Sequence, residues 1–244
     1  MIMSKHEEIA AGLIQDILTG RYRVGERLPS ERDLAGRFEA NRGSVREAMK
    51  KLEQIGLADV QAGGARVKDK EEASLDVIGH LLAKDTLPDE SLIDQILLVM
   101  SGLIAIAAIQ VTSLGSEKTI SDLRALVKPL KSQKMTKESH TIARLELINN
   151  FVQASGNLPL QLIGRALFQQ MAPNLTKLLP HVALDPKSFA PIANQLDSGL
   201  ESRDPDKVTS AFKQLYDMNR ESMMNAFSQA RKELELENNE AANQ

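Results

Sequence analysis

Apolar residues in the first part of the chain recur at steps of three and four positions, which is the spacing of a helix with one buried face. Three such segments follow one another. The first begins with Ser4 and Glu7, a capping-box pair, the second begins at Ser30, and the third spans residues 41–56. The pattern therefore predicts three short helices.

Beyond the third helix the helical spacing stops and a different pattern begins. Residues 57–60 and 66–68 have the length and composition of short strands. Gly63 and Gly64 lie between them, and glycine tolerates the positive φ angles of a tight hairpin. Three helices followed by a two-stranded wing is the pattern of a winged helix-turn-helix domain.

The rest of the chain shows helical periodicity and no competing strand pattern. A charged stretch at residues 68–72 precedes it, so we expect domains at 1–70 and 71–237 and a disordered tail at 238–244. The helices predicted in this part are 74–84, 89–113, 116–131, 137–155, 158–179, 186–202 and 205–236. The expected fold class is mainly α: a winged helix-turn-helix domain followed by an all-α helical bundle.

The composition of the chain limits the cellular compartment in which we expect the protein and the kinds of site that it can form. The 244 residues include no cysteine, which excludes disulfides and thiolate-based metal sites. The most apolar stretch, residues 96–109, is shorter than the about 20 residues that span a bilayer, and it predicts a buried helix. The N-terminus lacks the pattern of a secretion signal. We therefore expect a cytoplasmic protein that does not enter a membrane.

Charged residues are distributed unevenly along the chain, and the spacing of three cations indicates what the protein binds. Residues 1–70 hold 13 Lys/Arg and 11 Asp/Glu residues, whereas the remainder holds 17 and 22. Arg42, Arg46 and Lys50 stand four residues apart and project from one side of the third helix. An arginine near the start of a helix in the major groove can form a forked hydrogen bond with guanine, and a glycine wing with Arg66 at its margin suits the minor groove. The pattern predicts double-stranded DNA as a partner, with an ordinary solvated face as the alternative.

The N-terminal segment resembles the signature of GntR-type transcription regulators. The matching runs are residues 20–35 and 41–49, and the resemblance covers nearly all of residues 5–68. It implies operator-contacting arginines, small polar positions near the bases and a wing glycine. Gly43 departs from the family, which has a side chain there, and costs about 1 kcal/mol of helix propensity relative to alanine. Together with the helix face and the wing, the predicted DNA-binding residues are Arg32, Arg42, Gly43, Ser44, Arg46, Lys50, Gly63, Gly64 and Arg66.

The second part resembles the helical effector-binding domain of the FadR branch of GntR regulators. The matching words are residues 92–97 and 154–157. The resemblance implies a bundle with an internal cavity. We expect a homodimer in which each protomer reads half of a palindromic operator, acting as a repressor on the bacterial nucleoid.

The metal-binding group within this branch carries one Asp and three His around a divalent ion. The counterparts in this sequence are Arg144, Ile148, Ala193 and Leu215, none of which is a metal ligand. The histidines are scattered and lack metal-ligand spacing; they are His6, His80, His140 and His181. We therefore predict no metal and no cofactor.

A metal-free bundle must hold its effector by apolar burial and hydrogen bonds, although most apolar side chains in it simply fill the core. Arg144 and Asn219 would fix an acidic head group. The predicted effector-binding residues are Met100, Arg144, Ile148, Tyr216, Asn219 and Met223. We expect a fatty acyl-CoA or fatty acid. A small carboxylate is the alternative, because residues 216–220 depart from the family's acyl-CoA-contacting stretch.

Two other classes of function, an enzyme and a protein-interaction adaptor, agree less well with the sequence. An enzyme would need a nucleophile–base pair, a metal or a phosphate-cradling glycine loop, and the sequence shows none in a supporting context. The chain is therefore not expected to be an enzyme. A protein-interaction adaptor that has lost DNA binding is the more distant alternative.

Overall fold

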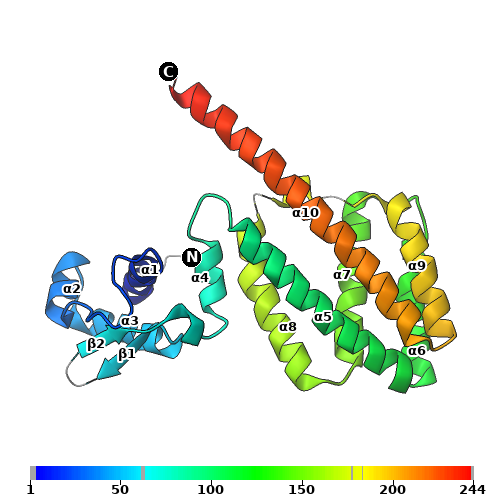
Figure 1. Cartoon of the computed structure of the whole chain (residues 1–244), viewed down its shortest axis with the longest axis horizontal. Helices are drawn as coiled ribbons and strands as arrows, with labels where there is room; N and C mark the ends of the chain where they lie inside the picture. The colour runs from blue at the N-terminus through cyan, green and yellow to red at the C-terminus, as the bar shows by residue number, and fades with distance from the viewer. Residues whose placement is uncertain (1–3, 62–63, 177, 183, 243–244) are drawn as a thin grey trace. The chain divides into compact units, whose positions relative to one another are not determined.

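The computed structural model describes residues 4–61, 64–176, 178–182 and 184–242, with side chains as far as residue 236 in the last helix. The chain forms two compact units, which divide after Asp89 (Figure 1). Within the described residues the first unit contains four α-helices, a short 3-10 helix and a two-stranded antiparallel sheet, and the second unit is helical. The expected mainly α fold class is confirmed.

The first unit begins with α1 (Lys5–Leu18), α2 (Glu31–Arg37) and α3 (Arg42–Gln54). Each helix starts at the predicted cap. The Ser4 amide donates to the Glu7 carboxylate at 2.8 Å, the Ser30 hydroxyl accepts from the Asp33 amide at 3.3 Å, and the Asn41 carboxamide accepts from the Ser44 amide at 2.8 Å. The buried faces of the three helices share one core with the sheet. These local signals place α3 with its polar side toward solvent.

The sheet consists of β1 (Ala58–Gln61) and β2 (Gly64–Val67), paired in antiparallel register with Ala58 opposite Val67. The predicted second strand started at residue 66, so Gly64 lies inside β2 and not at the turn. The backbone before α2 also pairs with β2. The Leu28 amide donates to the Ala65 carbonyl, and the Val67 amide donates to the Glu26 carbonyl, both at 2.9 Å.

The predicted domain boundary after residue 70 differs from the observed division. The charged stretch forms a short 3-10 helix, η1 (Lys70–Glu72), which leads into α4 (Val77–Leu82). Val77 is buried in the core of the first unit, and the Ser74 amide donates to the Ile55 carbonyl at 2.9 Å. Gly56, at φ +81°, leaves room for the backbone of Ala73 beside it. Residues 71–89 therefore belong to the first unit because apolar burial and backbone pairing hold them there.

An ion-pair network that the sequence did not reveal joins α1 to α2. Asp16, which is 9% exposed, accepts from Arg37 at 2.5 Å and from Arg21 at 3.3 Å. Arg37 also stacks on Phe38, with its guanidinium carbon 4.7 Å from the ring centre. The Asp16 carboxylate raises the pKa of Arg37. The network fixes α2 against the end of α1.

Replacing Asp16 by alanine should destabilise the first unit by about 1–3 kcal/mol, because the two arginines lose a carboxylate that is largely hidden from water. Chemical denaturation followed by circular dichroism measures the loss. Asp59→Ala, at a solvent-facing position of β1, is the matched control. Equal stability of the two variants would contradict this role for Asp16.

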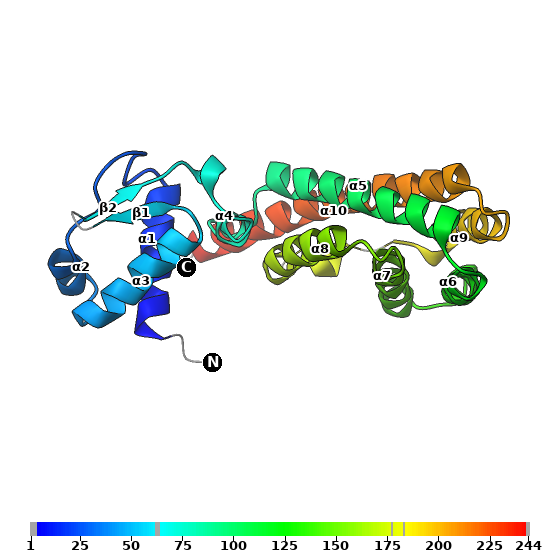
Figure 2. The ribbon, with the colours of Figure 1, turned by 90° about the horizontal axis from the view of Figure 1, so that it is seen from below.

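The second unit consists of six α-helices and two 3-10 turns (Figure 2). Their bounds are α5 (Glu90–Leu114), α6 (Glu117–Leu130), α7 (Lys137–Ala154), α8 (Leu158–Met171), η2 (Ala172–Leu175), η3 (Leu179–His181), α9 (Pro186–Glu201) and α10 (Pro205–Ala242). The core is formed by α5, α6, α7, α9 and α10, and Phe151 meets Phe212 edge-to-face inside it. Helix α5 packs against α10, α7 and α8.

Two helix ends differ from the sequence prediction. The segment 158–179 is not one helix, because α8 ends at Met171 and the backbone continues as the 3-10 turn η2. Pro173 has no amide hydrogen to continue the α-helical ladder. At the other end, α10 runs to Ala242, through most of the segment predicted as a disordered tail.

Helix α5 matches the predicted helix 89–113 to within one residue at each end, but it is more exposed than the sequence predicted. It has 25 residues and, among the described residues, is the one helix long and apolar enough to cross a bilayer. The apolar stretch at residues 96–109 is therefore part of a helix whose length is sufficient to span a bilayer. One side of α5 is buried, but Leu98, Val99, Ile106 and Ile109 are 47–60% exposed. The expectation of a fully buried helix is wrong, because α5 has neighbours in this unit on only part of its circumference.

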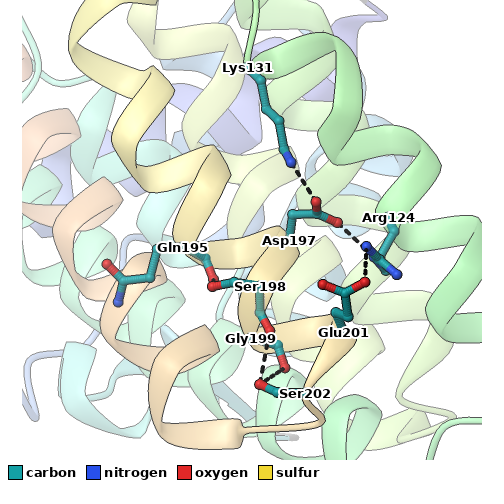
Figure 3. A network of polar contacts seen from close by, with 8 residues as sticks. All are labelled: Arg124, Lys131, Gln195, Asp197, Ser198, Gly199, Glu201 and Ser202. Atoms are coloured by element: carbon teal, nitrogen blue, oxygen red, sulfur yellow. Dashed lines mark hydrogen bonds and ion pairs between the residues drawn. The ribbon is translucent and has the colours of Figure 1, made fainter.

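Helices α6 and α9 are joined by charged side chains at the surface of the bundle. Asp197 of α9 accepts from Arg124 of α6 at 2.7 Å and from Lys131, at the end of α6 (Figure 3). Arg124 also donates to Glu201 at 2.9 Å. These cations lower the pKa of Asp197. The network aligns α9, the helix that carries one wall of the buried polar cluster described below.

Candidate DNA-binding interface and effector site

The side of α3 that points to solvent carries the predicted reading residues. Arg42, Arg46 and Lys50 are all exposed, the side chains of the last two at 64% and 69%. The Asn41 cap and the buried Val45, Ala48, Met49 and Leu52 orient this face outward. Three cations on successive turns along one face of a helix, the first of them at its start, suit the major groove of a duplex.

Arg46 is held by a carboxylate from the neighbouring helix. Its Nε lies 2.8 and 2.9 Å from the two carboxylate oxygens of Glu31, at the start of α2. The pair lowers the pKa of Glu31 and raises that of Arg46. Glu31 therefore orients Arg46 but also neutralises it. The sequence analysis gave no role to Glu31, because the contact joins residues 15 positions apart on two helices.

Glu31→Gln should tighten DNA binding about two- to five-fold, because Arg46 gains freedom and a negative charge beside the phosphates is lost. Fluorescence anisotropy with a labelled operator measures the dissociation constant. Glu39→Gln, at the C-terminal end of α2, is the control for the charge change alone. Weaker binding by Glu31→Gln would mean that the positioning of Arg46 outweighs its neutralisation.

The remaining predicted residues of α2 and α3 lie at the same end of the two helices. Arg32 is exposed, and its Nε is 3.8 Å from the Asp33 carboxylate. The Ser44 amide is part of the Asn41 cap. A Cβ on Gly43 would lie 3.0 Å from the Asn41 carboxamide oxygen. Glycine at this position therefore leaves the cap undisturbed, which offsets its low helix propensity.

The wing differs in detail from the prediction. Gly63 lies outside the described residues. Gly64 has φ +117°, and a Cβ there would lie 2.9 Å from the Arg27 guanidinium. Arg66 donates to the Gly25 carbonyl at 2.9 Å. Gly64 thus makes room for Arg27, and Arg66 ties the preceding loop to the wing.

Arg27 is a wing residue that the sequence analysis missed. It is exposed and bridges to Arg66 in the backbone pairing of the sheet. Its place beside Gly64 puts a second guanidinium on the wing. No local signal in the sequence marks it, because the contact joins residues that are 37 positions apart.

The predicted effector residues fall into two groups. Arg144 of α7 donates to the Asn219 carboxamide of α10 at 3.1 Å, and Ile148, one turn further along α7, packs against the same core. Met100 and Tyr216 are half-buried and Met223 is buried. No hydrogen bond within the described part of the chain links these three to Arg144. The structure thus brings together the two residues expected to hold an acidic head group.

The surroundings of Arg144 are polar and enclosed. Arg144 is 7% exposed and also donates to the Thr141 hydroxyl at 3.1 Å. His140, one turn earlier on α7, is fully buried and meets the Phe189 ring edge-to-face at 5.1 Å. Burial lowers the pKa of Arg144 to about 10, and burial together with Arg144 lowers the pKa of His140. His140 was missed as a site residue, although its spacing of four from Arg144 places both on one helix face.

A surface pocket of about 340 Å³ opens between α9, α10 and the η3 turn. Most of its lining is polar and includes His181, Asp185, Ser188, Glu221 and Asn225. Its apolar lining includes Met218, which packs against the bundle core. The arrangement suits a small polar molecule better than a long acyl chain.

The positions that correspond to metal ligands in the resemblance carry apolar or cationic side chains. Arg144 and Ile148 lie on α7, Ala193 on α9 and Leu215 on α10, and the last two are buried in the core. Within the described residues no group of three or more His, Asp or Glu side chains is placed to hold a metal ion.

Comparison with known proteins finds a family profile that matches most of the first unit. Residues 5–67 match the sequence profile described as "Bacterial regulatory proteins, gntR family". The chain is 28% identical over 226 residues to the HTH-type transcriptional regulator Mce2R of Mycobacterium tuberculosis, covering 89% of this chain and 91% of that one. It is 37% identical over 83 residues to the HTH-type transcriptional repressor NanR of Citrobacter rodentium, covering 33% and 32%.

Among solved structures, the fold is similar to that of Lar, which controls the agr system of Listeria monocytogenes. The match has a TM-score of 0.55 at 16% identity and covers 93% of this chain and 99% of that one. The geometry of α3 and the wing agrees with the family match. Residues 5–67 therefore match a GntR-family DNA-binding domain, and over most of its length the chain is similar to a transcriptional regulator.

Proposed function

We propose that the protein is an effector-controlled repressor that binds a palindromic operator in bacterial cytoplasm as a homodimer. The observation that carries the DNA-binding part is the exposed face of α3, where Arg42, Arg46 and Lys50 occupy successive turns. The similarity of about a third of the chain to NanR, a repressor by name, supports the direction of regulation. Repression follows when the bound dimer excludes the transcription machinery.

The exposed side of α5 supports the dimer. From residue 95 to residue 116 the chain carries no charged side chain. Leu98, Gly102 and Ile106 lie on one exposed stripe, four residues apart, and nothing lies near the open side of Gly102. Two copies of α5 crossing antiparallel at Gly102 would set Leu98 against Ile106 of the partner subunit, and the reverse. This self-complementary pattern fits a two-fold interface, and exposed apolar surface of this extent marks a contact site.

The effector is the part of the function with two candidates. A fatty acid or acyl-CoA would use the apolar interior of the bundle. The half-buried side chains of Met100 and Ile148 support this candidate. A small carboxylate would use the Arg144–Asn219 pair and the mostly polar pocket beside it. The polar lining favours the small carboxylate. Binding would change the arrangement of the two reading heads, for which a few kcal/mol of differential affinity is sufficient.

A mobility-shift experiment on the DNA upstream of the protein's own gene tests the proposal. We expect a discrete shifted complex that resists competitor DNA and weakens steeply with salt, because many phosphate contacts release counterions. Footprinting should then show protection of two related half-sites. Absence of any specific complex, with protein that is folded and dimeric, would favour the adaptor alternative.

A further inference from the structure

Helix α7 carries a buried positive charge that forms no ion pair with any of the described residues. Arg144 is 7% exposed, and it donates hydrogen bonds to the neutral side chains of Asn219 and Thr141. Its Nε has no hydrogen-bond partner within the described structure. A guanidinium has five donor hydrogens and fits a carboxylate with two parallel hydrogen bonds. In the described part of the chain no carboxylate forms an ion pair with it.

His140 adds a second unsatisfied group to the same place. It is fully buried, and neither of its ring nitrogens has a hydrogen-bond partner in the described structure. The Phe189 ring contacts both groups, since the Arg144 guanidinium carbon is 5.9 Å from its centre and the His140 ring meets its edge. Buried polar atoms are nearly always paired, so two unpaired groups side by side indicate a place that a ligand completes.

Arg144 keeps its charge at neutral pH, because its pKa of about 10 lies far above 7. A buried charge that is compensated only by neutral hydrogen bonds costs free energy of folding. A site of this kind is retained at the expense of stability, as binding and catalytic sites commonly are. The Phe189 ring beside it offers no such compensation.

We propose that Arg144 and His140, together with Asn219, bind the carboxylate of a small hydroxy- or amino-acid, and that this compound is the effector of the proposed regulator. The carboxylate supplies the missing negative charge and accepts from the Arg144 Nε and from His140. This inference rests on the proposed function for its regulatory meaning, but the binding itself does not depend on DNA.

The neighbouring pocket defines the rest of the ligand. Ser188 and Met218 line the pocket and directly precede Phe189 and Asn219, the residues beside Arg144. Asp185 and Glu221 stand in the same lining, and carboxylates there accept hydrogen bonds from hydroxyl or ammonium groups. A volume of about 340 Å³ suits a molecule of a few carbons. The flexible Met218 can move to admit it.

The test measures thermal stability and calorimetric binding of the full-length protein with D-glycerate, L-serine, decanoate and inorganic phosphate as probes. Arg144→Met is compared with Arg165→Met, which removes an exposed arginine of α8. We expect glycerate or serine to raise the Tm of the wild type and of Arg165→Met. The same probe should bind Arg144→Met at least about tenfold more weakly.

Stability without ligand separates a binding role from a structural one. If Arg144 serves a ligand, Arg144→Met should raise the ligand-free Tm by about 2–4 °C, because it removes an uncompensated buried charge. A lower Tm would make Arg144 a structural residue and overturn the proposal. So would equal binding by wild type and Arg144→Met, no binding of glycerate or serine, or stabilisation by decanoate or phosphate alone.

Failure of the site and failure of the proposed function give different results. Operator binding by the ligand-free wild type tests the regulator, and it does not involve Arg144. A wild-type protein that binds operator DNA but neither carboxylate would overturn the site alone. A protein that binds the carboxylate but no DNA would overturn the regulator alone.

Discussion

Arg42→Ala or Arg46→Ala is expected to abolish specific operator binding while the protein stays folded. Both side chains are exposed on the outward side of α3, and neither contributes to the core of the first unit. An arginine that forms two hydrogen bonds with guanine contributes at least about tenfold to specific affinity. In a dimer on a palindrome the contact is lost in both half-sites, so the lost binding free energy doubles. Fluorescence anisotropy with operator and scrambled duplexes measures the ratio of specific to non-specific binding.

The matched control for these two variants is Lys51→Ala. Lys51 is an exposed cation of the same helix, but it lies next to Lys50 and well away from the Arg46 direction. Its loss should lower affinity for both duplexes slightly and leave their ratio unchanged. Operator binding by Arg42→Ala and Arg46→Ala at the wild-type level would show that α3 is not the reading helix.

Ile106→Glu is expected to convert the proposed dimer into monomers. Ile106 is 48% exposed in the middle of the uncharged stripe of α5 and would contact Leu98 of the partner subunit. A carboxylate on each copy would be buried without a partner, which an apolar interface does not tolerate. Light scattering after size-exclusion chromatography measures the mass. Operator affinity should fall by about 100-fold or more, because one protomer holds a single half-site.

Ile142→Glu serves as the control for the dimer experiment. Ile142 lies on α7 and is 66% exposed, so the variant introduces the same charge on another helix of the same unit. It should remain dimeric and bind the operator normally. A dimeric Ile106→Glu variant would exclude the α5 stripe as the interface. Recovery of the wild type with membrane vesicles, and not as a dimer in solution, would assign that stripe to lipid.

The resemblance and the local signals together predicted the helices and the sheet of the first unit closely. Ser30 and Asn41 are caps whose side chains bond to amides three residues away, and contacts over this distance are readable from spacing. The same holds for the start of α9 at Pro186 behind its cap Asp185. Arg144 and Asn219 were both predicted as effector residues, but their direct contact spans 75 positions and could not be predicted from spacing.

Other features could not be read in this way. The Arg46–Glu31 pair, the Arg27–Gly64 approach and the Asp16 network all depend on how separate elements pack. The domain division was misplaced because a run of charges looks like a linker, whereas the burial of Val77 is a tertiary property. His140 carried no signal of its own, since a lone histidine is common on surfaces and in cores.

The sequence by itself determined the helices, their caps, the wing and the cationic face of α3, because these follow from periodicity and from contacts within a few residues. The tertiary structure alone decided which charges are paired and which are not. Arg46 looked free and is bound to Glu31, whereas Arg144 is enclosed with no carboxylate to meet it in the described residues. Charge compensation depends on distances between helices that are remote in the chain, and such distances are fixed only when the core packs.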